Sequence, residues 1–143
     1  MRKRRQIAAL PVKRREGNRI EVLLITSRDT GRWIIPKGWP WPKHSDRAAA
    51  EGEAWEEAGI RGSISHESIG TYRYEKRDGA KSRVLDVTVF VLEVGEEVEA
   101  WPEAEQRRRE WFPLVKAATL VDEPELRSLI LAYGEAVRIG PVR

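Results

Sequence analysis

Hydrophobic residues along this chain form short runs of strand length, and two further segments have the residue spacing of helices. The strand-like runs lie at residues 5–13, 20–27, 33–36, 63–75, 83–94 and 109–112. After the third run, helix-forming residues extend to Ala58 from an N-cap at Ser45 or Asp46, and Gly59 provides the C-terminal stop. A second helix is expected at residues 123–137, where apolar side chains recur at helical spacing.

The run at residues 83–94 differs from the others because it is apolar on both faces. Val87 and Val89 point to one side, whereas Phe90 and Leu92 point to the other. This alternation predicts a strand that is covered on both sides. Strands, a helix, more strands and a last helix together predict an α/β (α+β) fold, in which helices flank a mixed β-sheet.

The chain length of 143 residues is typical of one domain, so residues 1–143 are expected to form a single unit. No apolar run approaches the roughly 18 residues that a membrane-spanning helix needs, and no membrane partner is expected. The basic N-terminus lacks a following apolar segment, which argues against a signal peptide. The absence of cysteine excludes disulfides and thiolate metal sites, and a cytoplasmic location is expected.

The formal net charge is only +3, but positive charge is concentrated near the N-terminus. Residues 1–15 contain no acidic residue and carry Arg2, Lys3, Arg4, Arg5, Lys13, Arg14 and Arg15. This segment is either a solvated tail followed by a polar strand face, or an electrostatic footprint for a phosphate-rich ligand.

Three glutamates, Glu53, Glu56 and Glu57, share one face of the first predicted helix because positions i, i+3 and i+4 are neighbours there. Three adjacent carboxylates repel one another unless a cation neutralises them. Oxygen ligands of this kind suit hard cations such as Mg²⁺ or Mn²⁺. Taken alone, the same spacing is also that of an ordinary exposed acidic helix, so the surrounding residues must decide between these interpretations.

Those surrounding residues resemble the signature of the Nudix hydrolases, G-x5-E-x7-R-E-U-x-E-E-x-G-U, in which U is a bulky apolar residue. The segment 38–60 matches it in register at Gly38, Glu53, Glu56, Glu57, Gly59 and Ile60. The resemblance implies an α/β/α sandwich and a metal-dependent hydrolase in which Mg²⁺ or Mn²⁺ activates water for attack on a phosphoanhydride. It also implies that all three glutamates are catalytic and bind metal, that Gly38 ligates through its carbonyl, and that Glu56 or Glu57 is the base.

The signature is not complete in this chain. His44 replaces its first glutamate, Gly52 replaces its arginine, and the small Ala54 stands at the bulky position after the R-E pair. In the family, that arginine holds a catalytic glutamate through an ion pair, which glycine cannot do. Either Arg47 or Lys43 substitutes for it, or the site is less ordered before metal and substrate bind. Because the glutamates are retained, we expect activity to survive.

Further acidic ligands outside the signature occur in some members of the family, and the candidates here are Glu97, Glu99 and Glu103. The resemblance extends over about residues 2–135. The segments KRRQIAALPV, TSRDTGRWIIPKG and RRREWF are similar to the diphosphoinositol polyphosphate phosphohydrolase branch, which also cleaves diadenosine polyphosphates. Such substrates carry dense negative charge, so the pocket of this branch is lined by arginine and lysine.

The substrate-binding residues that the resemblance implies are mostly basic, since Arg side chains bind phosphate in a bidentate manner. They are Lys3, Arg4, Arg5, Ser27, Arg28, Lys37, His44, Arg83 and Arg109. His44 is alternatively a loop residue bonded to solvent or to the backbone. In place of the branch's PGGG, this chain has PKGW, which adds Lys37 to the rim of the site and places Trp39 beside the approach to it.

Three alternative functions remain open from the sequence. The first alternative is a Nudix enzyme that acts on ADP-ribose, a nucleotide sugar or capped RNA, with Trp39 or Trp41 stacking on a base. A module that binds nucleotides but lost catalysis is a second alternative, supported by Gly52 and His44. Nucleic-acid binding through the basic arm ranks last, because neither a recognition helix nor an aromatic platform is evident. We therefore expect a phosphate-rich small molecule as the partner and no specific nucleic acid; the sequence does not define an oligomeric state.

Overall fold

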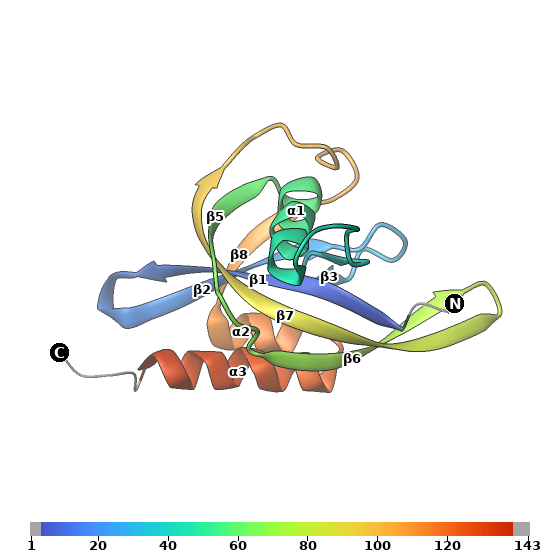
Figure 1. The fold of residues 1–143 in the computed structure, drawn as a ribbon. Coiled ribbons are helices and arrows are strands. Elements are labelled where there is room, and N and C mark those ends of the chain that lie inside the picture. The colour runs from blue at the N-terminus through green and yellow to red at the C-terminus, as the bar shows by residue number, and fades with distance from the viewer. Residues whose placement is uncertain (1–3, 139–143) are drawn as a thin grey trace.

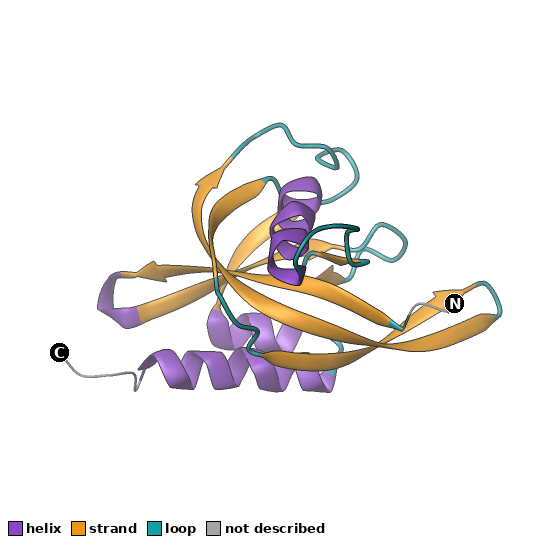
Figure 2. Ribbon diagram, in the orientation of Figure 1, coloured by secondary structure: helices purple, strands orange, loops and turns teal. Residues whose placement is uncertain are grey.

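A mixed β-sheet separates one helix from two others in the computed structural model, which describes residues 4–138. Figure 1 shows α1 on one face of the sheet and α2 with α3 on the other, and Figure 2 shows the same layers by type of element. The strands are β1 Arg5–Arg15, β2 Arg19–Thr26, β3 Trp33–Ile34, β4 Lys37–Gly38, β5 Ile60–Ile64, β6 Gly70–Asp78, β7 Lys81–Glu97 and β8 Arg109–Pro113. The helices are α1 Asp46–Ala58, α2 Leu114–Leu120 and α3 Pro124–Arg138, with a short 3-10 turn at Glu16–Asn18. This arrangement confirms the predicted α/β/α sandwich.

The centre of the sheet is a parallel pair of long strands, β1 and β7, in register from Arg5 opposite Asp86 to Val12 opposite Glu93. The order across the sheet is β3-β2-β1-β7-β5. β4 pairs antiparallel with the first half of β1, and β2 pairs with its second half. β7 is likewise shared, since β6 pairs with its first part and β5 with its last part.

Hydrophobic side chains pack on both faces of this sheet. Val87 and Val89 of β7 belong to the core beneath α2 and α3, whereas Phe90 and Leu92 belong to the core beneath α1. The predicted burial of both faces of this strand is therefore confirmed. The hydrophobic side chains that α1 packs against the sheet are small alanines, which bring the helix backbone close to the strands; they are Ala49, Ala50, Ala54 and Ala58.

The predicted bounds of α1 are confirmed by its caps. The Ser45 hydroxyl accepts a hydrogen bond from the Ala48 N–H at 3.2 Å. Gly59 adopts a left-handed conformation with φ 67° and donates its N–H to the Trp55 carbonyl at 3.0 Å. A residue with a side chain is strained in this conformation, so glycine suits the end of the helix.

The structure differs from the sequence-based expectations in three details. The strand expected at residues 63–75 is two strands, β5 and β6, because each pairs with a different part of β7. The chain pairs again after Pro36, where a strand was expected to end, and forms β4. The helix α2 was not predicted; it begins directly after Pro113, where β8 ends. No helix within residues 4–138 has both the length and the apolar character needed to span a bilayer.

Candidate active site

A polar pocket of about 290 Å³ lies where α1 meets β1, β4 and β6. We call it the central pocket. It is lined by Gln6, Ser27, Arg28, Asp29, Ile34, Lys37, Gly38, Trp39, Glu53, Glu57, Tyr74, Lys76 and Arg107. Two of the three signature glutamates therefore share one cavity with several basic side chains.

Glu57 is the most enclosed of these carboxylates, with 9% of its surface exposed. Its Oε1 accepts the backbone N–H of Lys37 at 3.2 Å, and its Oε2 lies 3.3 Å from the guanidinium of Arg107. The pKa of Glu57 is raised to about 7, mainly by burial; Arg107 opposes this rise, and the nearby Glu53 adds to it. The protein thus holds this carboxylate where a negative charge is poorly compensated.

Glu53 lies against the loop at Gly38. A Cβ atom added to Gly38 would be only 2.3 Å from Oε2 of Glu53, so glycine permits this close approach. The same Oε2 accepts a hydrogen bond from Nε1 of Trp41 at 3.0 Å. Burial is the main cause that raises the pKa of Glu53; the Trp41 bond lowers it, whereas Glu56 and Glu103 raise it.

Glu56 does not line the central pocket, although its backbone carbonyl accepts the N–H of Glu103 at 3.1 Å. Within residues 4–138, no three acidic or histidine side chains are arranged as a ready metal cluster. The donor chemistry nevertheless fits a hard divalent cation. Glu53 and Glu57 present carboxylate oxygens in one pocket. Glu53 raises the pKa of Glu57, and Glu56 and Glu103 raise the pKa of Glu53.

Arg107 links Glu57 to an acidic residue outside the signature. This buried side chain, 9% exposed, donates from Nε to Glu103 at 2.7 Å and from Nη1 to the Thr26 carbonyl at 3.0 Å, in addition to its contact with Glu57. Of the three outside acids considered, Glu103 is thus the one near the pocket. Glu97 instead bonds to Lys13 and to the indole of Trp111.

The replacements expected for the missing arginine do not reach the glutamates. Arg47 donates to the carbonyls of Ile64 and Ser65 at 3.0 and 3.1 Å. Lys43 is an exposed loop residue with φ 64°. Arg107, which lies far along the chain in the basic run at residues 107–109, forms an ion pair with the signature glutamate Glu57. Glu53 instead accepts the indole N–H of Trp41.

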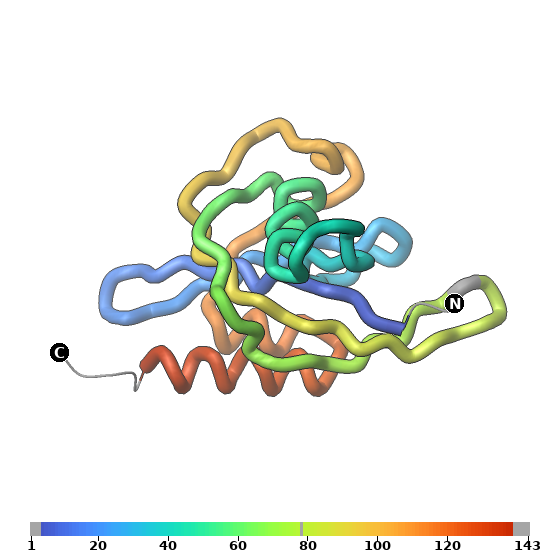
Figure 3. The backbone as a smooth tube through the Cα atoms, viewed as in Figure 1, coloured from blue at the N-terminus to red at the C-terminus, as the bar shows by residue number. Residues whose placement is uncertain are grey.

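The segment at residues 98–108 runs beside the C-terminal end of α1, as Figure 3 shows. Its Glu103 donates a backbone N–H to the Glu56 carbonyl, and its Arg107 pairs with Glu57. Val98 donates its N–H to the Gly59 carbonyl at 3.0 Å, and the indole of Trp101 donates to the Glu57 carbonyl at 3.0 Å. These bonds position the outside acid relative to the helix that carries Glu53 and Glu57.

Ser27, Arg28 and Lys37 are the predicted substrate residues that line the central pocket. Burial lowers the pKa of Lys37 to about 8 despite the nearby Glu57, and its ammonium lies 3.8 Å from the centre of the Tyr74 ring. A cation with little solvent around it gains from binding an anion. The pocket therefore combines carboxylates with partly desolvated basic groups.

The remaining predicted substrate residues do not line the central pocket. Arg4 is exposed, and Arg5 forms an ion pair with Asp46 at 2.6 Å. The His44 ring bonds to the Pro42 carbonyl at 2.9 Å, which agrees with the alternative of a loop histidine. Lys3 lies outside the described residues.

Arg83 and Arg109 also lie outside the lining of the pocket. The guanidinium of Arg83 is 5.7 Å from the ring centre of Trp39, which itself lines the pocket. Arg109 donates to the carbonyls of Ala58 and Val98 at 2.7 and 2.6 Å and lies over Trp101, so its side chain binds the end of α1.

Several lining residues were missed from the sequence: Gln6, Asp29, Tyr74, Lys76 and the position of Arg107. Gln6 had a usable signal, since it is a polar residue inside an apolar strand. It is 4% exposed, and its Oε1 has no hydrogen-bond partner within residues 4–138. A buried acceptor without a donor at a pocket wall is suited to a ligand. Tyr74 had no such signal within its predicted strand. Lys76 had none because that strand was expected to end before it.

In this fold, a segment containing Gly38 and a helix bearing glutamates meet at a polar pocket, on a mixed sheet between helices. This combination defines a class of hydrolase-like domain. The model of the NUDIX domain matches residues 2–133, and the chain belongs to the Nudix family. This confirms the membership that the signature indicated.

Among relatives, the chain is 34% identical to Nudix hydrolase 21, chloroplastic, from Arabidopsis thaliana over 85% of this chain and 60% of that protein. It is 38% identical to diphosphoinositol polyphosphate phosphohydrolase 3-alpha from Mus musculus over 68% of this chain and 57% of that protein. The chain thus spans little more than half the length of these curated relatives. A crystal structure of a C. elegans Ap4A hydrolase binary complex has the same fold, with a TM-score of 0.69, 22% identity, and coverage of 94% of this chain and 97% of that one.

Proposed function

We propose that this chain is a divalent-metal-dependent hydrolase that cleaves phosphoanhydride bonds of diphosphoinositol polyphosphates or diadenosine polyphosphates by attack of water. The observation that carries the proposal is the central pocket, where Glu53 and Glu57 lie together with Arg28, Lys37 and Lys76. Paired carboxylates are suited to a metal ion, and the basic side chains are suited to the phosphates of a substrate.

Glu53 and Glu57, with the carbonyl of Gly38, would hold Mg²⁺ or Mn²⁺, and Glu56 and Glu103 are further candidates. Bound there, the ion supplies polarisation of phosphoryl oxygens and a more acidic water. Glu57 is favoured over Glu56 as the base that takes a proton from water, because Glu57 lines the pocket.

The other lining groups orient the substrate. Arg28 and Lys76 bind phosphate oxygens at the opening of the pocket, and Lys37 does so from its partly buried position. Arg107 keeps Glu57 and Glu103 at a fixed separation through its two contacts. The unpaired Oε1 of Gln6 accepts a hydrogen bond from bound water or from a substrate hydroxyl.

The test is a panel of diphosphoinositol polyphosphate, diadenosine polyphosphates, ADP-ribose and nucleoside triphosphates, each with Mg²⁺, with Mn²⁺ and with chelator. We expect metal-dependent turnover that is strongest on the first two. Glu57→Gln should lower kcat by about 100-fold or more while the circular dichroism spectrum stays unchanged. Turnover that resists the chelator, or a Glu57→Gln variant with the wild-type rate, would contradict the proposal.

A second candidate substrate class, nucleoside diphosphate derivatives such as ADP-ribose, is favoured by the place of Trp39. Its indole lines the central pocket with Arg83 beside it, whereas Trp41 is not among the lining residues. An indole at a pocket wall is suited to stacking on a nucleobase. If a base binds there, Trp39→Ala should raise KM for adenine-containing substrates at least about 10-fold and leave KM for diphosphoinositol polyphosphate unchanged.

A further inference from the structure

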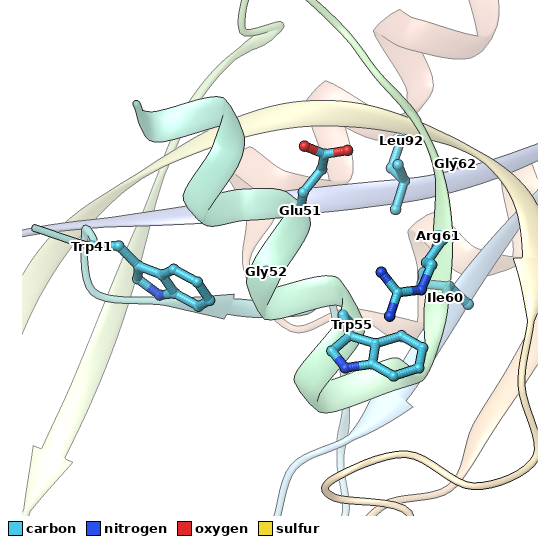
Figure 4. A pocket seen from close by; sticks show the side chains of 8 residues that line it. All are labelled: Trp41, Glu51, Gly52, Trp55, Ile60, Arg61, Gly62 and Leu92. Atoms are coloured by element: carbon cyan, nitrogen blue, oxygen red, sulfur yellow. The ribbon is translucent and has the colours of Figure 1, made fainter. Parts of the chain in front are cut away.

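Trp41 occupies the space that the glycine at position 52 leaves on α1. A Cβ atom added to Gly52 would lie 2.2 Å from Cη2 and 2.6 Å from Cζ2 of the Trp41 ring. Those separations are far below a van der Waals contact, so the indole and any larger residue at position 52 exclude each other. Figure 4 shows the Trp41 ring beside the helix at Gly52, at the edge of a second pocket between α1 and β5.

The nitrogen of the same indole contacts Glu53, which lines the central pocket. Nε1 of Trp41 donates to Oε2 of Glu53 at 3.0 Å. On its other side, this carboxylate lies against Gly38, where an added Cβ would be 2.3 Å from Oε2. Glu53 is therefore held between an N–H donor and a backbone that has no side chain to displace it.

The loop that carries Trp41 has local supports of its own. Trp41 stands between Pro40 and Pro42, and prolines restrict the backbone before the helix starts. The Trp41 carbonyl accepts the His44 N–H at 3.2 Å, and the His44 ring packs edge-on against the indole at a centroid distance of 5.7 Å. A side chain placed in this way can fix the carboxylate that it contacts.

We propose that Trp41 is the positioning residue for Glu53, and that the Trp41–Gly52 pair performs the task that the signature assigns to an arginine at position 52. The inference rests on the proposed function, since it explains how the departure from the signature is tolerated. An indole N–H orients a carboxylate without bringing a positive charge, so no side-chain cation at this contact competes with a divalent cation for the carboxylate.

The first test compares the wild type with Trp41→Phe, which keeps an aromatic ring on the loop but removes the indole N–H, together with the benzo ring that meets Gly52. Because a hydrogen bond to a charged group is lost, we expect kcat to fall about 10-fold and KM to stay within about twofold. Trp55→Phe is the matched control and should retain wild-type kcat, since the Trp55 ring packs with Arg61 at 3.8 Å, on the side of α1 away from the central pocket's lining. Wild-type kcat in Trp41→Phe would overturn the inference.

The second test exchanges the two arrangements. Gly52→Arg alone should be inactive because its side chain collides with the indole, and Trp41→Ala alone should be slow because Glu53 loses its donor. The double variant Gly52→Arg with Trp41→Ala should recover at least about tenfold over Trp41→Ala, since the arginine can then pair with Glu53. A folded double variant that is no faster than Trp41→Ala would count against the exchange.

A third readout is independent of substrate. In ¹H–¹⁵N spectra, the indole N–H resonance of Trp41 is assigned by its disappearance in Trp41→Phe. Replacing Glu53 with Ala should shift this resonance, whereas replacing the exposed Glu51 with Ala should not. An unmoved resonance overturns the Trp41–Glu53 assignment. Absence of turnover in the wild type, with the resonance shifted as expected, overturns the proposed function alone.

Discussion

Arg107 illustrates how much of this site depends on single side chains. Its guanidinium contacts Glu57, Glu103 and the Thr26 carbonyl while almost fully buried. The basic run at residues 107–109 looks uniform in the sequence, yet Arg108 is exposed and Arg109 binds backbone carbonyls. No sequence pattern distinguishes these three positions, because the partners that separate them come from α1 and β2. The side chains that matter most are thus the ones whose role depends on tertiary contacts.

Replacing Arg107 with Lys tests this role. Lysine is a point charge and cannot bridge two carboxylates and a carbonyl as a guanidinium does. We expect the free energy of unfolding to fall by about 2–4 kcal/mol and kcat to fall at least about 10-fold. Arg108→Lys is the control, since its ion pair with Glu110 is exposed and 3.8 Å long. Urea denaturation and steady-state kinetics measure both, and equal effects of the two substitutions would contradict the assignment.

The raised pKa of Glu57 predicts how stability depends on pH when chelator is present. Its folded-state pKa is about 7 and its ordinary value is 4.5, so the folded protein binds the proton more tightly. The contribution of Glu57 to the free energy of unfolding is therefore fully present below about pH 4.5, and it is lost as pH rises through about 7. We expect the thermal midpoint to fall between pH 5 and pH 8, and Glu57→Gln to reduce that fall. Lys37 affects stability at higher pH. Because its pKa is lowered from 10.5 to about 8, its protonation reduces the free energy of unfolding as pH falls from 10.5 to about 8.

At the scale of elements, α1 was the most predictable part of the fold. Its N-cap, its alanine face and its terminal glycine are all local signals, and they gave the observed bounds. β5, β6 and α2 were harder, because a strand break or a short helix depends on partners elsewhere in the sheet. The signature likewise located Glu53 and Glu57, but the segment 98–108 that completes the pocket has no sequence pattern that aims it at α1.

The contact between α1 and that segment predicts different effects for two glycines. Gly59 and Gly31 both have positive φ, at 67° and 72°, so Ala strains the backbone at either position. A Cβ on Gly59 would also lie 2.7 Å from the Trp101 ring, whereas a Cβ on Gly31 would meet nothing within 4 Å. We expect Gly31→Ala to cost about 1 kcal/mol and Gly59→Ala about 1–2 kcal/mol more.

Activity should separate the same two variants more sharply. Trp101 donates to the Glu57 carbonyl, so its displacement by Gly59→Ala moves the segment that carries Glu103 and Arg107. Gly59→Ala should then lower kcat, and Gly31→Ala should leave it close to wild type. Guanidinium denaturation and kinetics on the same preparations check both statements. Identical behaviour would show that backbone strain alone decides the outcome.

At the scale of the whole molecule, charge is distributed differently from what the sequence indicated. Several of the expected substrate-binding residues come from the basic N-terminal segment, but those of them that the structure describes do not line the central pocket. The basic groups there come from β4, β6 and two loops, namely Arg28, Lys37, Lys76 and Arg107. Segments distant in sequence thus build the positive side of the pocket, and composition alone cannot identify them.

A pair of charge reversals tests whether position or net charge governs substrate binding. Lys76 lines the central pocket, whereas Lys116 is an exposed residue of α2, on the opposite face of the sheet. Both Lys→Glu changes alter the net charge equally. Lys76→Glu should raise KM for a polyphosphate substrate at least about tenfold at low salt, and less at high salt. Lys116→Glu should have little effect; a comparable increase would show that only overall charge matters.

β7 takes part in both hydrophobic cores and pairs with β1, β5 and β6. Neither layer of helices can therefore unfold while the other remains folded, since both pack on the same strand. We expect a single cooperative transition on heating, detected alike by calorimetry and by tryptophan fluorescence. Amide protons in the middle of β7 should exchange with solvent only through complete opening of the molecule, and so more slowly than those of the β6–β7 hairpin tip.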